Sequence, residues 1–88
     1  QIERLDGNEA IMDARVTLDD INELFSLNLK GEGFDTIGGV LYHQLGKIPS
    51  ESDEVDYQGL RIRVLSTLGR RIKKVLVVKT NLDGESPN

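Results

Sequence analysis

The sequence predicts a small α+β domain in which two helices pack on a mainly antiparallel sheet, in the order ββααβββ. Apolar residues recur at helical spacing twice in the middle of the chain, over residues 18–26 and 37–46. Runs of alternating or β-branched apolar residues stand on either side of these segments, and glycine or polar clusters separate one run from the next. At 88 residues without cysteine, the chain has the size of one domain and no disulfide framework.

The first two apolar runs, residues 2–5 and 10–16, predict a β-hairpin. Gly7 lies in the polar turn between them, and glycine can adopt the positive φ that a tight turn requires. Thr17 follows and is expected to begin a helix over residues 18–26, because its hydroxyl can accept a hydrogen bond from a backbone N–H of the first turn.

Residues 28–35 are polar and predict a flexible connection to the second helix. Either Asp35 or Thr36 is expected to cap that helix. Its apolar residues recur three, four and eight positions apart over residues 37–46, and the glycine at its end is typical of a helix C-terminus.

Three strands are predicted in the last third of the chain, over residues 55–57, 60–64 and 72–78. Apolar residues alternate with arginine in the middle run, which indicates a strand with one buried face. The second half of the last run is apolar throughout, so we expect it to be buried on both faces. The domain is expected to span residues 1–80, and residues 81–88 form a polar C-terminal tail.

Charge is distributed unevenly along the chain. Residues 1–60 hold 13 acidic and 4 basic groups, a net charge of −9, whereas residues 61–88 hold 7 basic and 2 acidic groups, a net charge of +5. The favoured interpretation is that the basic C-terminal segment lies beside acidic elements of its own domain. The alternative is that the segregated charge forms a binding face.

Two adjacent glycines at the start of the second helix are unusual, because each costs about 1 kcal/mol relative to alanine in a helix interior. The favoured explanation for Gly38 and Gly39 is the close approach of a neighbouring element. The alternative is a nucleotide phosphate at the helix N-terminus. For that alternative, the candidate binding residues are Thr36, Gly38 and Gly39, with Arg70 and Arg71 as phosphate partners.

Other classes of function find little support in the residues. The chain has one histidine, His43, and no cysteine, and its acidic loop over residues 51–56 lacks the spacing of a calcium loop. No catalytic motif can be drawn, so we expect no enzyme activity. Few aromatic residues and an acidic remainder speak against a nucleic-acid partner. No apolar run reaches the roughly 20 residues that cross a bilayer.

Four segments together resemble the transporter-associated domain of the CorC/HlyC family, over residues 2–79. They are the strand-to-helix segment 13–24, Phe34-Asp35-Thr36-Ile37-Gly38-Gly39, Leu45-Gly46-Lys47-Ile48-Pro49 and Gly69-Arg70-Arg71-Ile72. Ser52 departs from the family pattern, which usually has glycine at this position. The conformation of that turn is therefore left open.

This resemblance implies the C-terminal module of a larger membrane protein, on the cytoplasmic side of the cell membrane. Its partners would be the CBS-domain pair and the membrane-spanning domain of the same protein, which is linked to magnesium and cobalt efflux or called a hemolysin. The fold is similar to the FAD-binding/transporter-associated domain-like fold, so flavin binding is inferred for the family.

The leading hypothesis is accordingly a non-catalytic regulatory or interaction domain of a membrane ion transporter. One alternative is a module that binds FAD or an adenine nucleotide at Thr36, Gly38, Gly39, Arg70 and Arg71. Another is a dimerisation element that forms a homodimer through an apolar strand edge.

Overall fold

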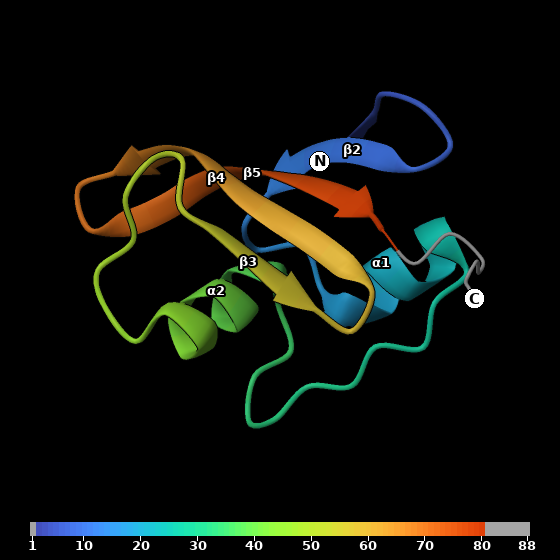
Figure 1. Ribbon diagram of the computed structural model, residues 1–88, viewed down its shortest axis with the longest axis horizontal. Coiled ribbons are helices and arrows are strands. Elements are labelled where there is room, and N and C mark those ends of the chain that lie inside the picture. Colours follow the sequence, from blue (N-terminus) through green and yellow to red (C-terminus); the bar gives the residue numbers. More distant parts are fainter. Residues whose placement is uncertain (1, 81–88) are drawn as a thin grey trace.

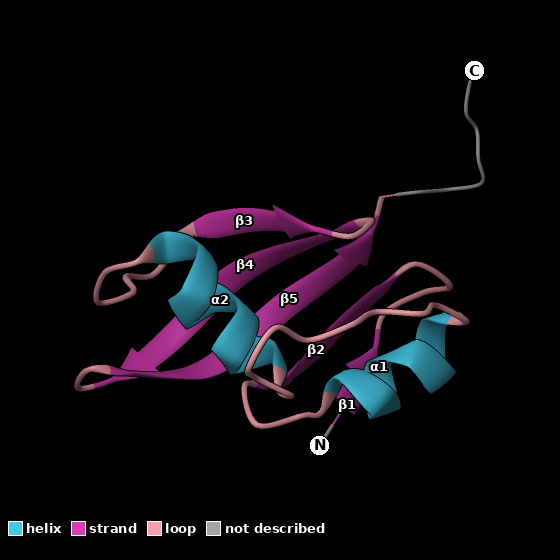
Figure 2. Ribbon diagram, turned by 90° about the horizontal axis from the view of Figure 1, so that it is seen from below, coloured by secondary structure: helices cyan, strands magenta, loops and turns pink. Residues whose placement is uncertain are grey.

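The computed structural model describes residues 2–80 and shows a five-stranded antiparallel sheet in the order β1-β2-β5-β4-β3 (Figure 1). Both helices lie on one side of this sheet (Figure 2). The predicted α+β class and the order ββααβββ are confirmed. The predicted tail, residues 81–88, lies outside the described residues. The elements are β1 (Ile2–Arg4), β2 (Glu9–Asp13), α1 (Leu18–Phe25), α2 (Ile37–Leu45), β3 (Glu54–Tyr57), β4 (Leu60–Leu68) and β5 (Arg71–Lys79).

Capping side chains set the start of both helices. The Thr17 hydroxyl accepts a hydrogen bond from the backbone N–H of Asp20 at the start of α1, as predicted. Of the two candidates for α2, Thr36 is the cap, and its hydroxyl accepts from the N–H of Gly39. α1 ends one residue before the predicted position 26, because Ser26 adopts the left-handed conformation that closes a helix. α2 ends at Leu45, and the predicted Gly46 closes it in the same conformation.

The core lies between the helices and the face of the sheet that they cover. Val75 and Val77 of β5 are fully buried there. Leu76 and Val78 point to the other face and are only partly buried. The prediction that this strand is buried on both faces is therefore wrong, because α1 and α2 cover the same side of the sheet (Figure 2).

Strand β4 is longer than the predicted run of residues 60–64 and continues to Leu68. The register between β4 and β5 shifts after Val64, where Val64 pairs with Val75 but Ser66 pairs with Lys74. This bulge interrupts the alternation of apolar and polar residues, which is why the pattern in the sequence stopped short.

The connection between the helices is held against the body of the domain, contrary to the flexible link expected for residues 28–35. The Asn22 side chain bonds to both the N–H and the C=O of Leu29. The Gln58 side chain does the same with Lys30, whose carbonyl also accepts from the Tyr57 hydroxyl. Leu29 is buried in the core.

The turn before β3 contains a residue with strained backbone geometry. Ser52 has a φ of 77°, in the left-handed region that favours glycine. Its N–H donates to the carbonyl of Val64 at 2.9 Å, and the N–H of Val64 donates to the carbonyl of Asp53 at 2.9 Å. The turn therefore extends the edge of the sheet, and the preference for glycine at this position has a physical reason.

Candidate functional site

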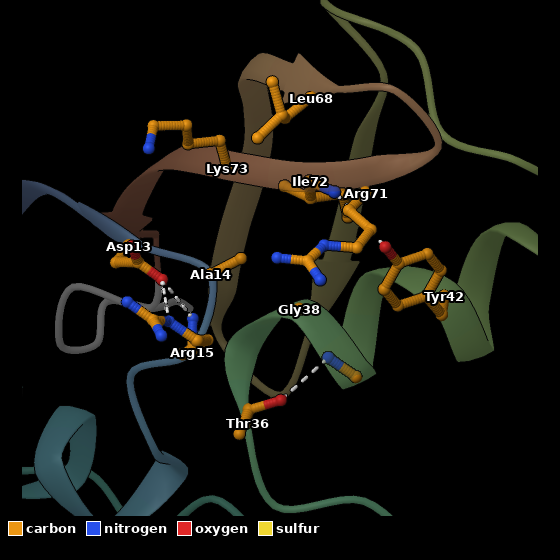
Figure 3. Close-up of a pocket in the computed structure, with 11 residues that line it drawn as sticks. Asp13, Ala14, Arg15, Thr36, Gly38, Tyr42, Leu68, Arg71, Ile72 and Lys73 are labelled. Atoms are coloured by element: carbon orange, nitrogen blue, oxygen red, sulfur yellow. Dashed lines mark hydrogen bonds and ion pairs between the residues drawn. The ribbon is translucent and has the colours of Figure 1, made fainter.

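A pocket of about 550 Å³ lies at the end of the sheet, between the β4–β5 hairpin, the residues after β2 and the start of α2 (Figure 3). Four of the predicted site residues line it, namely Thr36, Gly38, Gly39 and Arg71. Arg70 is not among the lining residues. The fold therefore brings the start of α2 and one of the two adjacent arginines to the same pocket.

The two glycines of α2 allow this helix to pack closely against its own chain. A Cβ atom on Gly38 would lie 2.9 Å from the Ala14 carbonyl oxygen and 3.1 Å from the Ala14 Cβ. A Cβ atom on Gly39 would lie 2.8 Å from the Phe34 Cβ. These distances are shorter than a normal contact, so close approach accounts for both glycines. The partners are the residue that follows β2 and a residue of the connection before α2, and neither belongs to a strand or to α1.

The N–H groups at the start of α2 already have partners within the chain. Ile37 donates to the carbonyl of Val16 at 2.9 Å, and Gly38 donates to the carbonyl of Ala14 at 2.8 Å. The N–H of Gly39 bonds to the capping hydroxyl at 3.1 Å. The helix start can thus contribute its positive field to the pocket, but these three amides are not available as donors to an anion.

Basic side chains supply most of the charge in the pocket. Arg71 extends its guanidinium into the space between Ala14 and Gly38, and Lys73 lies on the side nearer to Asp13 (Figure 3). Within residues 2–80, neither Arg71 nor Lys73 has an ion-pair partner.

A further basic group of the pocket is paired. The Arg15 Nε atom lies 3.2 Å from Asp13 Oδ1, and the Arg15 backbone N–H donates to the same oxygen at 2.8 Å. The backbone N–H and then the guanidinium of Arg15 hold the pKa of Asp13 below its ordinary value. Asp13 therefore remains an anion at neutral pH and keeps Arg15 beside it.

Tyr42 links α2 to the hairpin. Its hydroxyl accepts a hydrogen bond from the N–H of Ile72 at 3.2 Å and donates to the carbonyl of Arg70 at 3.5 Å. The backbone on both sides of Arg71 is thus fixed relative to the helix. This contact fixes the base of the Arg71 side chain at the mouth of the pocket.

Sequence reasoning did not identify Asp13, Arg15 or Tyr42 as residues of this site. The helical spacing indicated only that Tyr42 belongs to α2, and Arg15 stands far from the basic C-terminal segment. Lys73 did belong to that segment, although no feature marked it out from its basic neighbours. The antiparallel pairing of β2 with β5 brings these groups together, and it depends on the whole fold.

Strand pairing neutralises some of the basic residues of the C-terminal segment. Arg61 Nε lies 3.0 Å from Asp56 Oδ1, and Arg63 Nε lies 3.3 Å from Glu54 Oε2, both across the β3–β4 pair. The favoured interpretation of the charge pattern is confirmed for these two arginines. The five other basic residues of this segment have no ion-pair partner within the described part of the chain. Lys79 donates to the backbone carbonyl of Phe25. The remaining four lie at the β4–β5 hairpin, and we call them the basic hairpin cluster: Arg70, Arg71, Lys73 and Lys74.

Among residues 2–80, no group of three or more histidine, aspartate or glutamate side chains is placed to hold a metal ion. His43 lies on the surface of α2, with Nε2 3.5 Å from Glu32 Oε1, as expected for a surface helix position. No helix in this part of the chain is long and apolar enough to cross a membrane.

The sequence is similar to a protein family and to several named proteins. The family model described as "Transporter associated domain", CorC_HlyC, matches residues 3–81. Hemolysin C of Brachyspira hyodysenteriae is 28% identical over 89 residues, which cover 100% of this chain and 33% of that protein. The magnesium and cobalt efflux protein CorC of Escherichia coli K12 is 33% identical over 64 residues, which cover 73% of this chain and 22% of that protein.

Solved structures show the same architecture. The transporter associated domain CorC_HlyC from Nitrosomonas europaea is 28% identical, with a TM-score of 0.77 over 90% of this chain and 95% of that one. The chain spans only about a third of hemolysin C and about a fifth of CorC. The chain belongs to the CorC/HlyC family of transporter-associated domains.

Proposed function

We propose that this chain is a non-catalytic regulatory domain of a membrane ion transporter, on the cytoplasmic side of the cell membrane, and that the transporter exports magnesium or cobalt. Its partners are the CBS-domain pair and the membrane-spanning domain of the same full-length protein. Two features of the comparisons support the proposal. A relative carries the name of a magnesium and cobalt efflux protein, and the aligned region is about a fifth of that protein.

The basic hairpin cluster is the observation that carries the proposal. Its four side chains lie at one end of the sheet and are not neutralised by acidic groups of residues 2–80. Leu68 stands beside them with 64% of its surface exposed. Exposed apolar and basic groups side by side are suited to contact an acidic surface of another domain.

Regulation through such a surface requires a difference between two states of the transporter. A domain shifts a conformational equilibrium only by binding one state better than the other. The domain would therefore contact its partner in one transport state and lose part of that contact in the other.

Deletion of the domain from the full-length protein tests this function. We expect the rate of cobalt or magnesium efflux from cells to change while the amount of protein in the membrane stays the same. A second variant, Arg70→Glu with Lys74→Glu, alters the cluster but leaves the lining of the pocket intact. Unchanged efflux after deletion, with the same amount of protein in the membrane, would contradict the proposal.

A second candidate function is the binding of an adenine nucleotide or FAD. The pocket favours it, because Thr36, Gly38, Gly39 and Arg71 come together there. Titration calorimetry of the 88-residue chain with ATP, AMP and FAD tests this candidate. The absence of heat and of a thermal shift at millimolar ligand would exclude it. Flavin is included because of the fold resemblance alone.

A homodimer through an apolar strand edge finds no support in the two edge strands. β3 places Glu54 and Asp56 on one of its faces, and both acids are engaged with arginines of β4. β1 is three residues long and exposed along its length. Short and charged edges of this kind disfavour the addition of another strand.

A further inference from the structure

We propose that the pocket beside the β4–β5 hairpin binds a small phosphate-bearing ligand, whose phosphate is held by the side chains of Arg71, Lys73 and Arg15 and not by the amides at the start of α2. The inference rests on the second candidate function and names the groups that recognise the ligand. It also separates the two adjacent arginines, because it assigns the phosphate to Arg71 and gives Arg70 no part in binding.

The size and the walls of the pocket suit a small amphipathic molecule. Its volume of about 550 Å³ is in the range of small-molecule sites, roughly 300–1,000 Å³. Ala14, Ile72 and the exposed side chain of Leu68 form apolar walls, and the ring of Tyr42 forms another (Figure 3). The apolar part of a ligand can lie against these walls while its anionic group faces the basic side chains.

The charge of the lining favours an anion. Three basic side chains and one acidic side chain, Asp13, line the pocket, which gives a net charge of +2. The N-terminus of α2 adds a positive field from the opposite wall. Arg71 is suited to phosphate, because its planar guanidinium can donate two parallel hydrogen bonds and has no ion-pair partner within residues 2–80.

The amides of α2 cannot serve as the main phosphate donors. The N–H groups of Ile37 and Gly38 bond to carbonyls of the segment after β2, and that of Gly39 bonds to the capping hydroxyl. A phosphate would have to break these bonds to use them. Recognition is therefore left to side chains, and a substitution of one side chain can remove it without disturbing the helix.

Asp13 is an internal competitor for one of these side chains. Its carboxylate holds Arg15 at 3.2 Å and also accepts the N–H of residue 15 at 2.8 Å. Asp13→Asn keeps an oxygen that can accept this N–H but removes the negative charge. The variant should free Arg15 for the ligand and strengthen binding.

Calorimetry and thermal shift on the 88-residue chain test the inference, with ATP, AMP, pyrophosphate and inorganic phosphate as probes and acetate as an anion without phosphate. We expect Arg71→Ala to weaken binding by about tenfold or more, the effect of losing a charge-assisted hydrogen bond. Arg70→Ala should change the dissociation constant less than about twofold, because an exposed charge outside the pocket acts only through a screened field. Asp13→Asn should tighten binding severalfold.

The results separate the site from the function. Equal losses in the Arg70 and Arg71 variants would show a diffuse charge effect and overturn the assigned site. Nucleotide binding that is insensitive to Arg71→Ala would also overturn it, while the second candidate function would stand. If neither these probes nor FAD bind the unmodified chain, both fall. If inorganic phosphate binds as tightly as ATP and depends on Arg71, the site stands and free phosphate is its ligand.

A second measurement guards against loss of folding in the Arg71 variant. Amide chemical shifts of the unmodified chain should change on titration at Gly38 and Ile72, which face the pocket, and not at Asp56 on the edge of the sheet. Changes centred on β3 would place the ligand elsewhere and contradict the inference.

Discussion

Arginines near the two ends of strand β4 differ in whether they form ion pairs. At its start, Arg61 and Arg63 stand opposite Asp56 and Glu54 on β3 and form ion pairs across the strands. Beyond its end, the basic hairpin cluster forms no ion pair within residues 2–80. β3 pairs only with the first part of β4, and Asp13 of the neighbouring strand β2 is engaged by Arg15. The same residue type is thus neutralised at one end and left with free charge at the other.

This difference shows how a short edge strand can decide where a domain is able to bind an anion. An ion pair on the surface of a sheet neutralises a basic side chain that could otherwise bind an anionic ligand. The pairing of β3 with β4 extends only as far as Glu54 opposite Arg63. The positive charge that remains is therefore concentrated at the β4–β5 hairpin. Four predictions test the contrast between the two ends, beginning with the largest expected effect.

Gly38→Ala should disturb the packing of α2 beside the pocket and leave the ion pairs between β3 and β4 intact. The added methyl group would lie 2.9 Å from the Ala14 carbonyl oxygen, and overpacking of this kind costs about 1–3 kcal/mol. Urea denaturation measures the loss in free energy of unfolding. Gly7→Ala is the control, because nothing lies within 4 Å of a Cβ at that position. Equal effects of the two variants would contradict the close contact of α2 with Ala14.

Ser52→Gly should stabilise the turn that leads into β3, the strand whose acidic side chains pair with Arg61 and Arg63. Its φ of 77° is costly for a side chain, and relief of this strain should stabilise the domain by about 0.5–1 kcal/mol after the greater backbone freedom of glycine is subtracted. Ser50→Gly provides the comparison, since Ser50 is not among the residues of positive φ. It should be neutral or destabilising. A loss of stability in Ser52→Gly would show that the left-handed geometry is not a strain on this turn.

The ion pairs themselves can be compared with the unpaired cluster. Arg63 and Glu54 both remain partly exposed, so removal of their interaction should cost about 0.2–1 kcal/mol. A double-mutant cycle of Arg63→Met and Glu54→Gln measures this coupling. The same cycle with Arg70→Met in place of Arg63→Met should give no coupling. Coupling of similar size in both cycles would remove the distinction between the two ends.

Acid should weaken the turn before β3. The ammonium of Lys47, 2.7 Å away, and then the N–H of Ser50 hold the pKa of Asp53 below its ordinary value. A group whose pKa is lower in the folded state stabilises the fold above its unfolded pKa, about 4, and this contribution is lost as the pH falls through the folded pKa. Asp53→Asn should flatten the decline in stability below about pH 4. An unchanged decline would assign it to other carboxylates, and Glu51→Gln is the control.

Local features of the fold were predictable from the sequence. Threonine before each helix, glycine after α2 and alternation in the first half of β4 depend on hydrogen bonds and faces within a few residues. The burial of β5 was not predictable from its sequence, because it depends on which side of the sheet the two helices cover. The extension of β4 was hidden by the bulge after Val64.

The candidate site was predictable only in part. The sequence identified the start of α2 and the pair Arg70 and Arg71, but it did not distinguish between the two arginines. Which of them faces the pocket depends on the turn at Gly69, with a φ of 65°, and on the contact with α2. Arg15 reaches the same place because β2 pairs with β5, and no spacing in the sequence indicates that pairing.

The two hydrogen bonds of the Tyr42 hydroxyl have a mechanical consequence. They couple the tip of the hairpin to α2, and the first amides of α2 are in turn bonded to the segment between β2 and α1. A load that displaces the tip must either break the bonds of this hydroxyl or rotate the helix with it. If the helix rotates, its N-terminal end moves with it. That end is attached to the beginning of α1, because Thr36 and Thr17 form a β-bridge.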